Sequence, residues 1–232
     1  MGEPFGQKID VRPLFEHDRS VLLALLRELG PADWERPTAA APWTVRDLVS
    51  HMLGDDLNRL SRTRDAHSGE GPRPGEDLPA FIHRINDEWV GATRRTSPAV
   101  LTSLLEATSP QILAMWRSLD LDALGEPVTW AGPDPAPVWL DCARDFTEYW
   151  GHQQQIRDAT GRAGLGGDPV VRGVLHTFLL ALPHTLAGHD GAEGTTLSVV
   201  VEGPGRGAWS WRHTAGRWRG LPPIADASTV LT

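Results

Sequence analysis

Apolar residues recur at spacings of three and four along most of the first 160 residues, which is the period of an amphipathic α-helix. The expected helices are residues 11–29, a segment that starts after Thr44, residues 78–94, a segment that starts at Pro98, and residues 139–159. Four or five such helices, joined by loops of moderate length, predict a helical bundle in which each apolar face packs against its neighbours.

Short polar and proline-containing segments mark where these helices begin and end. Thr44 stands in the N-cap position and Asp47 follows three residues later, which is the arrangement of a capping box. Pro110 lies inside the helix that starts at Pro98, and an interruption is allowed for there, because proline lacks a backbone N–H. Residues 130–137 contain three prolines and are predicted to form a loop.

The pattern changes after residue 164. Residues 170–186 carry one more helical period, and from residue 195 the apolar residues take the pattern of β-strands. The expected strands are residues 197–202, 208–212 and 216–218, with a hairpin turn at residues 203–205. The sequence therefore predicts a helical domain over residues 1–164 and a small α+β domain over residues 165–232.

Two histidines lie on predicted helices with acidic residues one turn away. Glu148 and His152 project from neighbouring turns of one helix, so they could hold two corners of a metal polyhedron. The same spacing suits a surface ladder in which Glu148 pairs with Arg144. His51 lies at the edge of an apolar stripe, with Asp55 one turn further on, either as a half-buried histidine or as part of a site. Spacing alone leaves these alternatives open.

Composition narrows the functional classes. The net charge of −8 and the pI near 5.5 do not favour a nucleic-acid partner, and no apolar run approaches the roughly 20 residues of a membrane span. Cys142 is the only cysteine, which excludes an internal disulfide, and its place on an apolar stripe favours a small buried residue over a nucleophile.

The N-terminus lacks the basic-then-apolar order of a secretory signal, so a cytoplasmic protein is expected. Lys8 is the only lysine among 22 basic residues, a bias that suggests a high-GC, actinobacterial type of genome.

Two segments stand out when they are taken together. Residues 43–51 read WTVRDLVSH, and residues 148–157 read EYWGHQQQIR. They resemble the W-T-V-R-D-x-x-x-H and E-x-x-x-H-x-x-D-I-R motifs of the mycothiol-dependent maleylpyruvate isomerase family, within the wider DinB-like superfamily. The order of the motifs also agrees, and the resemblance extends over nearly the whole chain. One departure is Gln155, which stands where the family usually has Asp.

The resemblance implies a mainly α fold, a DinB-like four-helix bundle followed by a small α+β C-terminal domain. It implies one divalent metal at the open end of the bundle, held by His51, Glu148 and His152. Zinc is expected for such ligands, although nickel and iron also accept them. Asp47 and Asp55 are the candidate hydrogen-bond partners of His51, because metal-bound histidines usually have a partner on the other nitrogen. No residue is singled out for binding the thiol.

The resemblance also implies thiol chemistry on a small-molecule substrate. Mycothiol, as a thiol cosubstrate, adds to an unsaturated acid, the adduct rotates, and elimination returns the isomer. An S-transferase acting on another electrophile and a non-catalytic DinB-like metal-binding protein remain open alternatives. Members of the family continue past a segment like residues 225–231 into a final helix with an arginine near the active site. This chain stops at Thr232, so a truncated C-terminal domain is expected.

Overall fold

The computed structural model describes residues 6–189 and 191–221, which form two compact units. One, the helical unit, contains Phe15–Ser118 and Tyr149–Leu165. The other, the mixed unit, contains Leu119–Glu148 and the described residues of Met1–Leu14 and Gly166–Thr232. Because each unit draws on separate segments of the chain, compactness alone does not test the boundary predicted at residue 165, which stays a prediction.

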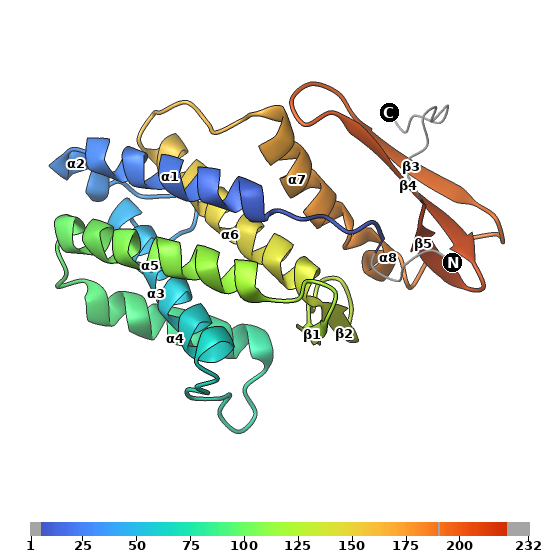
Figure 1. Ribbon diagram of the computed structural model, residues 1–232, viewed down its shortest axis with the longest axis horizontal. Coiled ribbons are helices and arrows are strands. Elements are labelled where there is room, and N and C mark those ends of the chain that lie inside the picture. The colour runs from blue at the N-terminus through green and yellow to red at the C-terminus, as the bar shows by residue number, and fades with distance from the viewer. Residues whose placement is uncertain (1–5, 190, 222–232) are drawn as a thin grey trace. The chain divides into compact units, whose positions relative to one another are not determined.

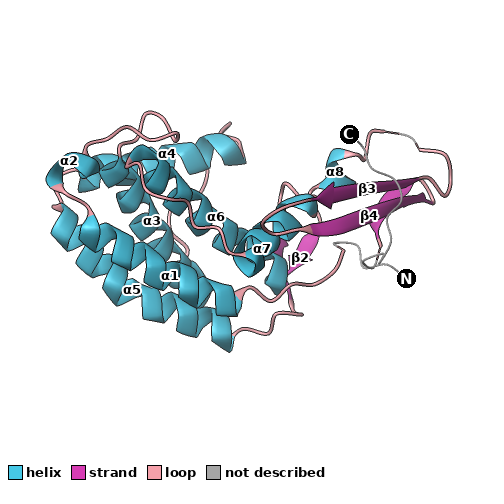
Figure 2. Ribbon diagram, turned by 90° about the horizontal axis from the view of Figure 1, so that it is seen from above, coloured by secondary structure: helices cyan, strands magenta, loops and turns pink. Residues whose placement is uncertain are grey.

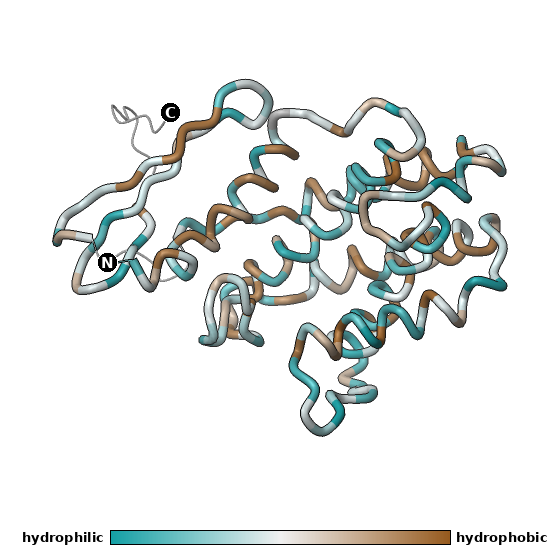
Figure 3. The backbone as a smooth tube through the Cα atoms, turned by 180° about the vertical axis from the view of Figure 1, so that it is seen from behind, coloured by the Kyte–Doolittle hydropathy of each residue, from teal (hydrophilic) through white to brown (hydrophobic). Residues whose placement is uncertain are grey.

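Helices account for nearly all regular structure in the helical unit, as the apolar pattern predicts (Figures 1 and 2). They are α1 (Arg12–Glu28), α2 (Pro31–Trp34), α3 (Val45–Arg59), the π-helical η1 (Leu60–Arg64), α4 (Leu78–Thr93), α5 (Pro98–Ser118) and the second half of α6 (Val138–Ala159). Apolar and polar residues alternate along these helices, as expected of amphipathic helices (Figure 3). The expected four-helix bundle consists of α1, α3, α5 and α6.

Helix α3 begins as its sequence predicts. The Thr44 hydroxyl accepts a hydrogen bond from the Asp47 N–H, and the Asp47 carboxylate accepts one from the Thr44 N–H, both at 3.3 Å. This reciprocal capping box satisfies two N–H groups that the first turn leaves without helical partners. From this cap onward α3 buries residues on most of its circumference, because it packs against both α4 and α5.

Helix α4 approaches α3 closely at Gly54. A Cβ at this position would lie 2.7 Å from the indole of Trp89, closer than side chains pack. The Trp89 indole N–H donates a hydrogen bond to the Ser50 carbonyl at 2.7 Å, so the ring is held in place over the glycine. Gly54 is therefore needed for its lack of a side chain, and not for an unusual backbone conformation.

The four bundle helices meet at the buried carboxylate of Asp56 on α3. Arg19 of α1 donates to both carboxylate oxygens, at 3.1 and 2.5 Å. The hydroxyl groups of Thr108 on α5 and Tyr149 on α6 donate to the same carboxylate. The Arg19 guanidinium also lies over the Tyr149 ring, 3.7 Å from its centroid. A buried charge needs a partner and a full set of hydrogen bonds, and Asp56 has both.

The interruption allowed for at Pro110 is absent, and α5 is continuous from Pro98 to Ser118. Proline removes one rung of the helical ladder, but polar side chains around it bond to carbonyls of the preceding turns. Ser109 donates to the Leu105 carbonyl at 2.6 Å, and Gln111 donates to the Ala107 carbonyl at 2.8 Å. These bonds strengthen the turns on either side of the Glu106 carbonyl, the acceptor that Pro110 leaves without an N–H donor.

Two further expectations are wrong in the mixed unit. Residues 130–137 are not entirely loop, because β2 (Pro135–Pro137) pairs antiparallel with β1 (Leu124–Pro127). The helix expected over residues 170–186 divides into α7 (Asp168–Leu179) and α8 (Leu182–Thr185). Pro183 explains this division, since its ring would clash with the Leu179 carbonyl and it has no N–H to offer that carbonyl.

The strands predicted near the C-terminus are confirmed as one three-stranded antiparallel sheet, in the order β3 (Thr196–Val201), β4 (Gly207–Thr214) and β5 (Arg217–Gly220). The hairpin joins Val201 to Gly207, which face each other across the ladder. Gly205 in its turn has a φ of 74° and lies against Val171, where a Cβ would come within 2.7 Å. Both the backbone conformation and the close approach require glycine there.

Residues 225–231, where the C-terminal truncation was expected to show, lie outside the described residues. Within the described part of the chain, no helix is long and apolar enough to cross a membrane.

Candidate metal centre

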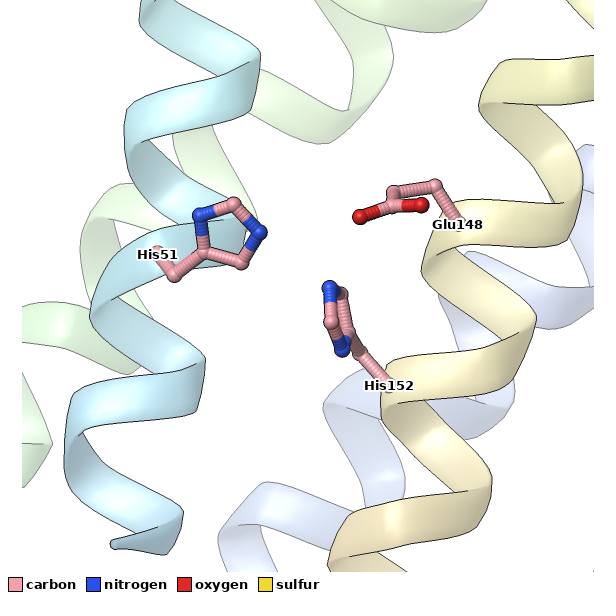
Figure 4. Close-up of side chains that lie close together, drawn as sticks. All are labelled: His51, Glu148 and His152. Carbon is pink, nitrogen blue, oxygen red and sulfur yellow. The ribbon is translucent and has the colours of Figure 1, made fainter. Parts of the chain in front are cut away.

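Three side chains with metal-binding atoms converge between α3 and α6. His51 lies on α3, and Glu148 and His152 lie one turn apart on α6. One potential ligand atom from each residue falls within 4.8 Å of the other two. In Figure 4 a ring nitrogen of each histidine points toward the Glu148 carboxylate. Residues 97 positions apart in the sequence (148 − 51) are thus brought to one point by two helices.

The residues around His51 fix its ring. The imidazole is buried and packs against Trp43, with 4.8 Å between the ring centroids. The ring of His152 meets it edge-on at 4.9 Å. Trp43 stands just before the cap of α3, so the same capping box that starts the helix also places the indole against the histidine.

The two acidic residues expected to support His51 differ in position. The Asp55 carboxylate lies 3.3 Å from Nε2 of His51, one turn further along α3. The Asp47 carboxylate caps the first turn through Thr44 and lies 3.3 Å from Nε of Arg94. Asp55 is therefore the acid beside the histidine, and a role for Asp47 toward His51 stays a prediction.

His152 has a partner that sequence reasoning noted only as a departure from a motif. Nδ1 of His152 lies 2.9 Å from Oε1 of Gln155, three residues further along α6. When Nδ1–H donates to this oxygen, Nε2 keeps its lone pair for an ion. The i, i+3 spacing on one helix was the signal that could have identified this contact from the sequence.

Exposure of the three residues to solvent differs in a way that suits a reacting site. His51 is buried, His152 is half-buried and Glu148 is exposed. The cluster is therefore buried at His51 on α3 and accessible to solvent at Glu148 on α6. Arg144, considered as a surface partner of Glu148, donates instead to Asp141 at 2.8 Å.

The donor set fits a divalent metal. Two imidazoles and one carboxylate are the ligands of many catalytic zinc sites, in which a fourth position stays open for water or substrate. Nickel and iron accept the same donors, so the ligands do not select one metal.

Cys142 lies on the same helix but offers no alternative nucleophile. Its side chain is 1% exposed, and burial, followed by the charge of Asp145, raises the pKa of the thiol well above its usual range. A thiol that stays protonated is a poor nucleophile and a poor metal ligand. This agrees with its predicted role as a small buried residue.

Comparison with known proteins places the chain in a family. The sequence matches no curated protein significantly. Among the similar solved structures are the mycothiol-dependent maleylpyruvate isomerase and a histidine-to-alanine variant of it. Each has a TM-score of 0.53 and 16% identity, over 80% of this chain and 72% of the other, which shows a shared fold.

The model of the mycothiol maleylpyruvate isomerase N-terminal domain matches residues 15–157, more than half of the chain and a span that includes His51, Glu148 and His152. The chain belongs to the mycothiol maleylpyruvate isomerase N-terminal domain family.

Proposed function

We propose that this protein is a divalent-metal-dependent enzyme that uses mycothiol as a thiol cosubstrate and isomerises an unsaturated acid by thiolate addition and elimination. The observation that carries the proposal is the convergence of His51, Glu148 and His152, whose ligand atoms lie within 4.8 Å of one another. The family to which the chain belongs supports the choice of thiol.

In this proposal the three side chains hold the metal and leave one side free. His51, buried against Trp43, is the rigid ligand. Helix α6 supplies the other two ligands, Glu148 and His152. A bound zinc ion would act as a Lewis acid that favours the thiolate over the thiol and orients it. Asp55, beside His51, adds negative charge next to the ligands and so strengthens the attraction for a cation.

The proposed reaction needs no oxidant or reductant. The thiolate sulfur forms a bond to one carbon of the double bond, and the π electrons move onto the conjugated carbonyl. Rotation about the resulting single bond follows. The carbon–sulfur bond then breaks, the double bond re-forms in the other geometry, and the thiolate leaves. The chain's task is to hold thiol and acid in reach of each other, since positioning lowers the entropic part of the barrier.

We place this activity in the cytoplasm, where low-molecular-weight thiols are kept reduced. The same site could serve S-transfer to another electrophile, in which the first adduct is released as the product.

Calorimetric titration of the purified protein with mycothiol tests the proposal. Binding that is present with one metal per chain and disappears after chelation supports it, and incubation with candidate unsaturated acids then separates isomerase from transferase. Metal binding without thiol binding would contradict the thiol-dependent enzyme and leave a DinB-like metal-binding protein. Thiol binding that survives complete chelation would contradict the role of the metal.

A further inference from the structure

The contact between His152 and Gln155 governs which nitrogen of the histidine is free. Both side chains are half-buried, and Oε1 of Gln155 lies 2.9 Å from Nδ1 of His152. A neutral imidazole carries one N–H and one lone pair, so the partner of Nδ1 decides whether Nε2 is a metal ligand or a hydrogen-bond donor.

A glutamine amide can satisfy either form of the ring, and a carboxylate cannot. Its oxygen accepts a hydrogen bond and its NH₂ group donates one, whereas an ionised carboxylate only accepts. With Oε1 toward the ring, Nδ1–H of His152 donates to Gln155 and the lone pair of Nε2 is available. With the amide turned over, the NH₂ group of Gln155 donates to Nδ1, and the proton of the imidazole resides on Nε2.

The second form is also satisfied without a metal. Nε2–H of His152 then points toward the cluster that contains the Glu148 carboxylate, a good acceptor for an imidazole N–H. No net proton is gained or lost between the two forms, because one proton moves from Nδ1 to Nε2 through solvent while the amide turns. The empty site therefore has a stable arrangement of its own that an ion must displace.

We propose that Gln155 is a positioning residue whose amide lets His152 alternate between a metal-binding and a metal-free tautomer. As a result, the metal is bound more weakly and exchanges more easily than it would with a residue at position 155 that only accepts hydrogen bonds. This inference rests on the metal site of the proposed function. It goes beyond that site by assigning the affinity for metal to a residue that touches no metal.

The test compares Gln155→Glu with a matched control, Gln154→Glu. Glutamate is nearly the same size as glutamine but only accepts, so it holds His152 with the proton on Nδ1. Gln154, the preceding residue of α6, accepts from the Leu165 N–H at 2.9 Å, so its replacement adds the same charge beside the site without touching His152. The dissociation constant of zinc is measured for the three proteins by competition with a coloured chelator.

We expect Gln155→Glu to bind zinc about 10- to 100-fold more tightly than the unmodified protein, the usual range for a change of the residue that orients a metal-bound histidine. Gln154→Glu should show only the smaller effect of one added charge. Equal affinities of the two variants would overturn the inference, while failure of all three proteins to bind zinc would contradict the proposed function instead.

A measurement on the metal-free protein tests the inference independently of metal. Nitrogen-15 NMR of His152 distinguishes the two tautomers by the shifts of Nδ1 and Nε2. At a pH high enough to keep the imidazole neutral, we expect both tautomers in the unmodified protein and only the Nδ1–H form in Gln155→Glu. A single Nδ1–H form already present in the unmodified protein would contradict the inference.

Discussion

The guanidinium of Arg19 and the carboxylate of Asp56 form an ion pair in the core of the helical bundle, with side chains that are 2% and 0% exposed. Their contact joins α1 to α3, and Thr108 and Tyr149 extend it to α5 and α6. One carboxylate thus connects all four bundle helices, two of which carry the candidate metal ligands.

Asp56→Asn should destabilise the protein strongly. The amide keeps the shape of the side chain but removes the counterion that the buried Arg19 guanidinium contacts, which costs about 3–5 kcal/mol in comparable sites. Urea unfolding followed by circular dichroism measures the loss. The matched control is Asp122→Asn, since the Asp122 carboxylate pairs with Lys8 at an exposed site and should cost at most about 1 kcal/mol. Equal losses in the two variants would refute the importance of the buried pair.

Gly54→Ala should weaken the contact between α3 and α4. The added methyl group would lie 2.7 Å from the Trp89 ring, and moving that ring breaks its hydrogen bond to Ser50. We expect a loss of about 1–3 kcal/mol. Gly91→Ala on α4 is the control, because nothing lies within 4 Å of its Cβ and alanine is the better helix former. Thermal unfolding measures the stability of both variants. A Gly54→Ala protein as stable as Gly91→Ala would contradict the prediction.

Asp18 should make the protein less stable as pH rises. Burial raises the pKa of this carboxyl to about 7, against the opposing charges of Arg19 and Arg157. The folded state therefore holds a proton that the unfolded chain has already released, and stability is lost between the ordinary pKa of 3.8 and about pH 7.

Asp18→Asn removes this loss while leaving an oxygen to accept from Gln153. Relative to the unmodified protein, the variant should gain roughly 1–3 kcal/mol of stability between pH 5 and pH 8. Urea unfolding at the two pH values, with a chelator present throughout, measures the difference. A stability difference that is the same at both values would show that Asp18 is ionised in the folded protein.

Cys142 should resist thiol reagents until the protein unfolds. Its side chain is 1% exposed and burial keeps the thiol protonated, so a disulfide reagent should modify it only in denaturant. Under the proposed function, Cys142→Ser should bind metal and mycothiol as the unmodified protein does. Rapid modification of the native protein, or loss of thiol binding with the metal retained, would point to a cysteine mechanism.

Local signals in the sequence were sufficient for the start of α3 and for the Glu148/His152 pair, whereas the addition of His51 to that pair came from the family resemblance. Thr44 and Asp47 are three residues apart, and Glu148 and His152 four, so the pattern itself contains the contact. The network at Asp56 was not predictable, because its partners Arg19, Thr108 and Tyr149 lie 37, 52 and 93 residues away. Arg19 and Thr108 are residue types usual at surface positions, and only the packing of the helices brings them to Asp56.

Two features were predictable in principle but were not predicted. They are the break between α7 and α8 and the contact of Gln155 with His152. Both follow from short-range geometry, the first from Pro183 and the second from an i, i+3 pair on one helix. The apolar period continues past Pro183 and conceals the break, whereas Gln155 stood out only as a departure from the family motif.

The most direct test of the metal site is elemental analysis of the purified protein beside His51→Ala and His152→Ala, with exposed His83→Ala as a control for the loss of a histidine. We expect one metal ion per chain in the unmodified protein and in His83→Ala. His51→Ala and His152→Ala should contain almost none, while circular dichroism shows that both remain helical. Full metal content in folded His51→Ala and His152→Ala would show that the ion, and the chemistry proposed for it, belongs to another site.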